Sequence, residues 1–158
     1  MSDLLPSQES WNSGSGNAVM FKDIIESIKN KDGMEIHVGS DSQIIKEKVS
    51  FAVAVCLISP GSGGIFYVKR FSQPAQRYSQ LGYRLQQEVN YSIDIAQKIK
   101  DACKDRNISI HLDVNKRHEC KSGKYAKQLS SYVEAMGFKF FLKPESWASG
   151  TVADRHTK

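Results

Sequence analysis

Apolar residues follow two different periods along this chain, and the period indicates which segments form strands. Apolar and polar positions alternate over residues 34–38 and 108–114, which is typical of half-buried strands. Residues 49–59 are almost all apolar, as in a strand that lies inside a sheet. With two shorter apolar runs, the pattern predicts five strands, at residues 34–40, 49–59, 65–71, 108–114 and 138–142.

Apolar residues spaced three and four apart predict helices around these strands. The longest helix should carry one apolar stripe, formed by Leu81, Leu85, Ser92, Ile95, Ala96, Ile99 and Cys103. In all, the spacing predicts helices over residues 18–30, 78–104, 124–136 and 147–158. The last of these contains Gly150, Thr151 and Val152, which are poor helix formers.

The order of these elements predicts the sheet topology. The Gly-rich turn at Pro60–Gly64 makes the second and third strands an antiparallel pair, so the chain opens with a three-stranded meander. A strand that follows a long helix is expected to return by a right-handed crossover, which makes residues 108–114 parallel to 34–40. We therefore expect an α/β fold with a mixed five-stranded sheet, three antiparallel strands plus two parallel ones, flanked by helices. Residues 1–17 should be a flexible arm, and 18–158 a single domain that begins with an additional helix at 18–30.

Acidic residues occur at two strand ends and within the apolar stripe of the long helix in this predicted fold. Asp41 follows the first strand and Asp113 ends the fourth, so parallel pairing would bring both carboxylates to one edge of the sheet. Glu88 falls near the middle of the apolar stripe of the long helix, where an unpaired carboxylate is unfavourable. A bound metal ion would explain these positions. Ordinary turn chemistry at Asp41 and a salt bridge from Glu88 to Arg84 are the alternatives.

The meander, helix, strand, helix, strand, helix order with these acids resembles the ribonuclease H-like superfamily. Three segments, Val38–Gln43 (VGSDSQ), Leu112–Asn115 (LDVN) and Ala153–Lys158 (ADRHTK), are similar to the bacterial YkuK-type family within it. The resemblance covers the chain from about Met34 to its end. It implies an RNase H-like fold and a four-carboxylate site made of Asp41, Glu88, Asp113 and Asp154.

The resemblance also implies a reaction: hydrolysis of phosphodiester bonds in RNA, DNA or an RNA/DNA hybrid, assisted by two Mg²⁺ or Mn²⁺ ions. Hard divalent ions prefer carboxylate oxygens, and clustered carboxylates repel one another without them. The chain departs from the ribonuclease H pattern in one respect. The segment before Asp154 has no histidine, whereas His156 follows the acid, and on a helix Lys158 would be the nearer neighbour.

Charge and composition are compatible with a nucleic-acid partner. The 158 residues carry a net charge of +5. A basic cluster of Lys116, Arg117, Lys121 and Lys124 covers the loop at residues 115–123 and the first residue of the next helix. These side chains could follow a phosphate backbone, although a simple solvated loop has the same composition. The three cysteines are widely spaced and suggest no disulfide framework. Without an apolar leader or a membrane-length apolar run, the sequence suggests a cytoplasmic protein.

Two histidines are the remaining candidate residues. His37 and His111 should lie on the polar side of the two parallel strands, either as hydrogen-bonded structural residues or as supports for the carboxylates.

The favoured function is a metal-dependent nuclease. The main alternative is a catalytically weak nucleic-acid-binding module on the same fold, which would need the basic loop but not every acid. A scaffold domain whose acids hold a structural ion would need neither for its partner.

Overall fold

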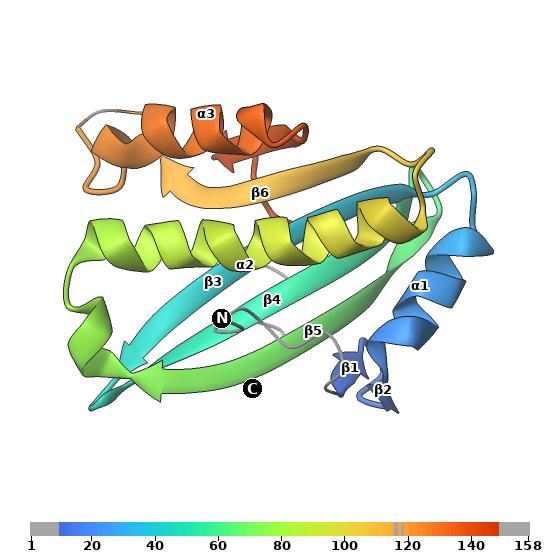
Figure 1. The fold of residues 1–158 in the computed structure, drawn as a ribbon, viewed down its shortest axis with the longest axis horizontal. Helices are drawn as coiled ribbons and strands as arrows, with labels where there is room; N and C mark the ends of the chain where they lie inside the picture. Colours follow the sequence, from blue (N-terminus) through green and yellow to red (C-terminus); the bar gives the residue numbers. More distant parts are fainter. Residues whose placement is uncertain (1–9, 116, 118, 149–158) are drawn as a thin grey trace.

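A mixed sheet of seven strands forms the centre of the molecule (Figure 1). The structure, a computed structural model, describes residues 10–115, 117 and 119–148. The spatial order of the strands is β2-β1-β5-β4-β3-β6-β7. Their bounds are β1 Trp11–Ser13, β2 Ala18–Val19, β3 Glu35–Ile45, β4 Lys48–Ser59, β5 Gly63–Pro74, β6 Ile108–Asn115 and β7 Lys139–Lys143. The five predicted strands are therefore present as β3 to β7.

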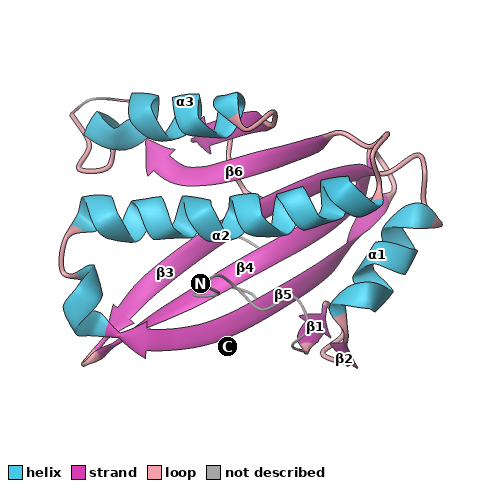
Figure 2. Ribbon diagram, viewed as in Figure 1, coloured by secondary structure: helices cyan, strands magenta, loops and turns pink. Residues whose placement is uncertain are grey.

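The meander of β3, β4 and β5 is the longest continuous part of the sheet (Figure 2). β3 and β4 pair antiparallel from Glu35↔Ile58 to Ile45↔Lys48, and β4 pairs with β5 along its whole length. Gly61 and Gly63 make the β4–β5 turn possible, since both have a positive φ angle that other residues rarely adopt. The hairpin turn predicted from Pro60–Gly64 is confirmed.

The crossover from β5 to β6 runs through a long helix, α2 (Leu81–Ala102), after a short 3₁₀ turn, η1 (Ala75–Tyr78). β6 lies parallel to β3, paired from Ile36↔Ile108 to Gly39↔His111, and β7 lies parallel to β6. A second short 3₁₀ turn, η2 (Gly123–Tyr125), and the helix α3 (Ala126–Ala135) connect β6 to β7. The mixed α/β architecture expected from the sequence is thus the one observed.

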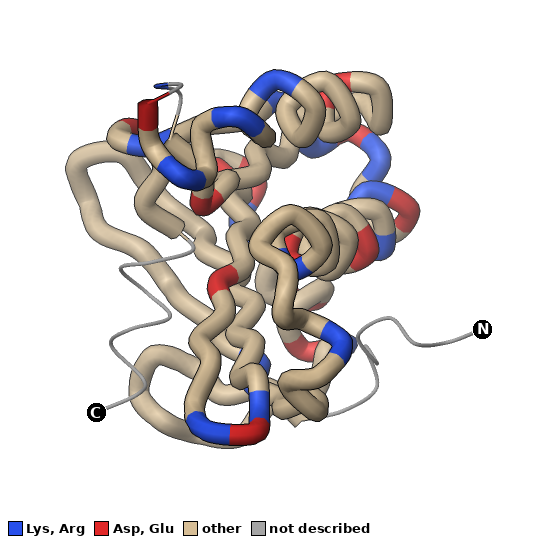
Figure 3. Tube along the Cα trace, turned by 90° about the vertical axis from the view of Figure 1, so that its left-hand side faces the viewer, with Lys and Arg blue, Asp and Glu red and all other residues tan. Residues whose placement is uncertain are grey.

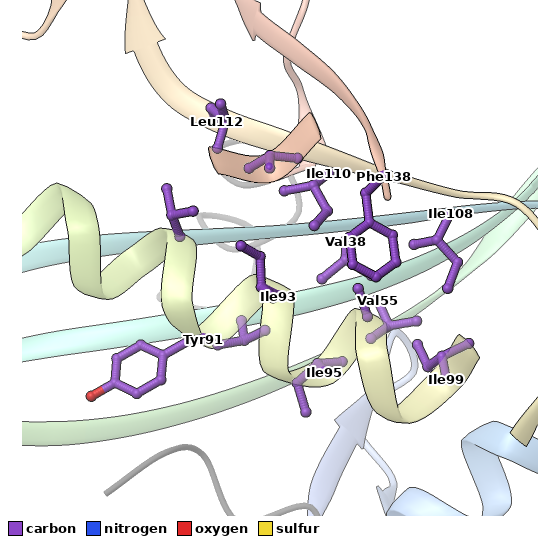
Figure 4. Packing of buried hydrophobic residues seen from close by; sticks show 14 of the residues in the cluster. Val38, Val55, Tyr91, Ile93, Ile95, Ile99, Ile108, Ile110, Leu112 and Phe138 are labelled. Carbon is purple, nitrogen blue, oxygen red and sulfur yellow. The ribbon is translucent and has the colours of Figure 1, made fainter. Parts of the chain in front are cut away.

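One face of the sheet carries the main core. The helices α1 (Phe21–Lys29), α2 and α3 all contribute to a single buried cluster with that face. Figure 4 shows α2 lying along the sheet, with apolar side chains of the helix and the strands between them. Fully or almost fully buried members include Ile24, Ile28, Val38, Val55, Ile95, Ile99, Ile110 and Val133. Alternate positions of β4 supply this core, so its near-continuous apolar sequence means that both faces of the strand are covered.

On the opposite face of the sheet, the middle of β4 carries small residues. Ala52, Ala54 and Cys56 of β4 form a second buried cluster with Val68 and Ala148. Small side chains allow the segment after β7 to lie close to the strands. Burial raises the pKa of the Cys56 thiol to about 12, so this thiol stays protonated at neutral pH.

The N-terminal region differs from the expected flexible arm. β1 pairs antiparallel with β5 and with β2, which adds two short strands to the five that were expected. Trp11 is completely buried, and its ring lies 5.9 Å from that of Phe21 in α1. The expectation was wrong for residues 11–13 because burial of one large aromatic side chain outweighs the polar composition around it. Helix α1 also starts later than predicted, since residues 18–19 belong to β2.

A helix was predicted over residues 147–158, but the residues after Ala148 lie outside the described part of the chain. Asp154, His156 and Lys158 are among them. Among the helices that the structure describes, none combines the length and the apolar character needed to cross a membrane.

Candidate active site

Asp41 and Asp113 lie at the same end of the parallel β3–β6 pair. The pairing of these strands ends at Gly39↔His111, and each aspartate lies two residues further along its strand. Asp41 was expected where its strand stops, but β3 continues to Ile45 in its pairing with β4. The strand therefore ends later than predicted, whereas the parallel ladder ends before Asp41. The shared register explains why the two carboxylates come together.

Glu88 completes a group of three acids. It projects from α2 and is only 4% exposed, as the apolar stripe around it predicted. One carboxylate oxygen each from Asp41, Glu88 and Asp113 can be chosen so that all three lie within 4.8 Å of one another. These residues come from three different elements, β3, α2 and β6. The structure thus brings together three of the four acids singled out in the sequence, and the fourth, Asp154, lies outside the described residues.

Hydrogen bonds from β3 position these side chains. The hydroxyl of Ser42 donates to Glu88 Oε2 at 2.5 Å, and the backbone N–H of Ser42 donates to Asp41 Oδ1 at 2.8 Å. One helical turn beyond Glu88 in α2, Ser92 shares a hydrogen bond of 2.6 Å with Ser40 of β3. The sequence suggested a salt bridge from Glu88 to Arg84, but Ser42 is the hydrogen-bond partner that the structure gives Glu88.

The electrostatic environment favours the protonated form of Glu88. Burial raises the pKa of its carboxyl group well above the usual value, and the negative charges of Asp113 and Asp41 raise this pKa further. The hydrogen bond from Ser42 and the charge of Arg84 act in the opposite direction and only partly offset these effects. A bound cation would lower this pKa, because its positive charge would stabilise the ionised carboxylate against burial and against the repulsion from the two aspartates.

Lys143 is a member of the site that the sequence did not reveal. Its ammonium group lies 2.6 Å from Asp113 Oδ1, at the end of β7. The hydrogen bond and the charge of Asp113 raise the pKa of Lys143, with smaller contributions from Asp41 and Glu88 and against the effect of burial. A signal for it existed: a lysine that ends the third parallel strand belongs at the same sheet edge as Asp113.

His37 and His111 form a buried pair next to this region. Nδ1 of His37 lies 2.9 Å from Nε2 of His111, and His37 Nε2 lies 2.9 Å from Glu35 Oε1. The backbone N–H of Trp147 donates to His111 Nδ1 at 3.0 Å. Of the two roles considered from sequence, the structure supports hydrogen-bonded structural residues, and it adds that the pair holds the segment after β7.

The basic loop is described only in part. Lys116 lies outside the described residues, and Arg117 forms an exposed ion pair with Glu119 at 2.9 Å. The ammonium of Lys124 lies 5.2 Å from the centre of the Tyr125 ring, while Lys121 is exposed. Tyr125 in turn packs against the first turn of α2, because a Cβ atom on Gly82 would lie 2.8 Å from its ring. Lys124 and Tyr125, which follow the loop, therefore lie near the start of the helix that carries Glu88.

The three acids suit a hard divalent ion. Mg²⁺ and Mn²⁺ bind carboxylate oxygens, and they need several such oxygens converging within a few ångströms. The spacing of the Asp41, Glu88 and Asp113 oxygens meets this requirement, and the buried, repelled carboxylate of Glu88 lacks enough positive charge around it. Soft-metal ligands are not part of this group, which argues against a zinc–thiolate site here.

Comparison with known proteins identifies the fold family. A family model described as ribonuclease H-like matches residues 19–158, which is most of the chain. The chain belongs to the ribonuclease H-like family. Among curated proteins, it is 25% identical to the uncharacterized protein YkuK of Bacillus subtilis (strain 168), over 87% of this chain and 91% of that protein. The resemblance inferred from the sequence segments is thereby confirmed, both for the ribonuclease H-like superfamily and for the YkuK-type relationship.

Proposed function

We propose that this ribonuclease H-like protein is a divalent-metal-dependent nuclease that hydrolyses phosphodiester bonds. The observation that carries the proposal is the convergence of Asp41, Glu88 and Asp113 at the carboxyl edge of two parallel strands in this fold. Family membership of the chain adds to the argument. Ligands in α/β proteins collect at this edge, and three converging carboxylates need a cation to offset their charge.

Each acid has a part in this proposal. Asp41 and Asp113 would each offer carboxylate oxygens to Mg²⁺ or Mn²⁺, and Glu88 would do so from the helix side, oriented by Ser42. Asp154 would complete the set from the C-terminal segment. When two such ions are bound, they supply an activated water and a stabilised leaving 3′ oxygen. The role of the chain is to hold the ligands rigidly, which the three separate elements accomplish through packing.

The nucleic acid would contact basic residues around the site. We propose that Lys116, Arg117, Lys121 and Lys124 contact the phosphate backbone. This is supported by Tyr125, which follows the loop, packs against the start of α2 and lies beside the Lys124 ammonium. Figure 3 shows that positive and negative positions are interleaved over much of the molecule. Substrate contact is thus expected to be local to the site rather than spread over a wholly basic face.

The test is a nuclease assay with matched variants. Labelled RNA/DNA hybrid, single-stranded RNA and duplex DNA are incubated with Mn²⁺ or Mg²⁺ and the wild-type protein, Asp41→Asn or Asp32→Asn. Asp32 lies on an exposed turn, so its variant removes the same charge away from the site. We expect metal-dependent cleavage by the wild type and Asp32→Asn, and a loss of at least about 100-fold in Asp41→Asn.

Two other outcomes would contradict the proposed nuclease activity. Nucleic-acid binding without cleavage by the folded wild-type protein would favour the binding module. Equal cleavage by Asp41→Asn and the wild type would show that the activity comes from elsewhere, including a contaminating nuclease.

A further inference from the structure

Lys143 reaches the acidic group through an irregularity in the sheet. β6 and β7 pair regularly as far as His111↔Phe141, and the next pair is Asn115↔Lys143. Four residues of β6 therefore oppose two of β7, so β6 bulges around Asp113. This bulge brings the end of β7 level with the site, and the Lys143 ammonium lies 2.6 Å from Asp113 Oδ1. Bulges commonly redirect side chains beside functional sites.

The contact is an ion pair between the ammonium of Lys143 and the carboxylate of Asp113. The negative charges of all three acids favour the charged form of the lysine, with the contribution of Asp113 the largest. The Lys143 side chain is 48% exposed, whereas the Asp113 side chain is 20% exposed. The lysine side chain is thus half exposed, and it can move away from Asp113 without disturbing the core.

A divalent ion held by these acids would come close to the same ammonium. Asp113 offers one of the oxygens that lie within 4.8 Å of one another, so an ion shared by the three acids would sit within a few ångströms of Lys143 Nζ. Two cations that close repel each other, and each competes for the same carboxylate. Lys143 and the metal are therefore alternative partners of Asp113.

We propose that Lys143 is the resident cation of this site, and that a divalent ion binds by displacing its ammonium from Asp113. The inference rests on the proposed function, because it requires Asp41, Glu88 and Asp113 to bind a metal. It adds that the metal affinity of the site is set by a competing side chain of the same protein. The site accordingly keeps one positive charge before the ion arrives, which limits repulsion among the acids.

The test measures Mn²⁺ affinity by isothermal titration calorimetry. The proteins are the wild type, Lys143→Met and Lys139→Met; Lys139 is an exposed lysine at the other end of β7, so it controls for the loss of one positive charge. Removal of the competing ammonium should tighten Mn²⁺ binding about tenfold in Lys143→Met. Binding to Lys139→Met should stay within about twofold of the wild type.

A second measurement uses the unaltered protein. NMR of ¹⁵N-labelled lysine ammonium groups detects ammonium groups held in hydrogen bonds, and the Lys143→Met spectrum assigns the signal of Lys143. Titration with diamagnetic Mg²⁺ should shift or remove this signal, in step with saturation of the site. Other lysine signals should change little.

Three results would overturn the inference. Unchanged or weaker Mn²⁺ binding by Lys143→Met overturns the competition but leaves a metal site, and with it the proposed function, standing. A Lys143 signal that is unaffected by saturating Mg²⁺ does the same. Absence of Mn²⁺ binding by every protein, at concentrations up to several millimolar, overturns this inference together with the proposed function.

Discussion

At the scale of single residues, the buried histidine pair shows how one backbone contact sets which ring nitrogens of two side chains donate and which accept. The N–H of Trp147 can only donate, so Nδ1 of His111 must be an acceptor and its proton must be on Nε2. Nε2 then donates to His37 Nδ1, and His37 Nε2 donates to Glu35. Burial, helped by the neighbouring His37, lowers the pKa of His111 to about 3. The chain of hydrogen bonds thus requires a neutral His111.

This requirement makes stability dependent on pH. In the unfolded chain His111 binds a proton below a pH of about 6.5, whereas in the folded protein it does so only near pH 3. The unfolded state therefore gains a proton as the pH falls from about 6.5, and we expect this histidine to lower the free energy of unfolding by about 2 kcal/mol at pH 5. Urea unfolding at pH 7 and pH 5, without metal, measures the difference.

The control for this prediction is His111→Phe, which cannot titrate. Both proteins should carry Glu88→Gln, because the raised pKa of Glu88 favours proton binding by the folded state and has the opposite sign above pH 4.5. The loss of stability between pH 7 and pH 5 should be smaller in the His111→Phe protein. An equal loss in both would mean that His111 does not account for the acid sensitivity.

At the scale of secondary-structure elements, the β4–β5 hairpin depends on one close approach. Gly64 of β5 pairs with Ile58 of β4, and a Cβ atom at this position would lie 2.5 Å from Ile58 Cδ1 and 2.8 Å from the Leu57 carbonyl oxygen. The Ile58 side chain could rotate away, but the Leu57 carbonyl belongs to the strand backbone and cannot. Glycine is needed here for space rather than for an unusual φ angle.

We therefore expect Gly64→Ala to destabilise the protein by about 1–3 kcal/mol. Gly33→Ala is the matched control, because a Cβ atom there would meet nothing within 4 Å, and its effect should stay within about 0.5 kcal/mol. Midpoints of urea unfolding at neutral pH give both values. Equal stability of the two variants would contradict the close packing at Gly64.

At the scale of the whole molecule, the acidic group exists only in the folded state. Asp41, Glu88 and Asp113 are far apart in sequence and come from β3, α2 and β6, so the unfolded chain has no comparable arrangement of ligands. An ion that binds the folded protein and not the unfolded chain must stabilise the fold. Metal binding by these three residues would therefore be coupled to global stability.

This coupling predicts a thermal shift. Mn²⁺ at about 100 times its dissociation constant should stabilise the fold by about 2.7 kcal/mol and raise Tm by about 5–10 °C. Asp113→Asn should lose most of the shift, whereas Asp32→Asn, which alters an exposed turn, should keep it. Differential scanning calorimetry with Mn²⁺ and with EDTA measures both. A shift of the same size in Asp113→Asn would place the ion elsewhere on the protein.

Much of the architecture follows from local sequence alone. Alternation and apolar spacing are local properties, so β3 to β7 and α1 to α3 could be predicted, although their ends shifted by a few residues. Because a helical crossover makes the flanking strands parallel, the meeting of Asp41 and Asp113 could be predicted too. The apolar stripe of α2 likewise predicted that Glu88 is buried.

Tertiary structure decided the features that depend on contacts between distant segments. The pairing of β1 with β5 and the burial of Trp11 could not be read from a polar N-terminal stretch. The choice of Ser42 as the partner of Glu88, and the approach of Lys143 to Asp113, depend on strand register and on a bulge in β6. Register and bulges result from the packing of the whole sheet, so no local pattern encodes them. The sequence by itself therefore determined that Asp41, Glu88 and Asp113 lie together. Only the folded sheet determined that Ser42 and Lys143 contact them.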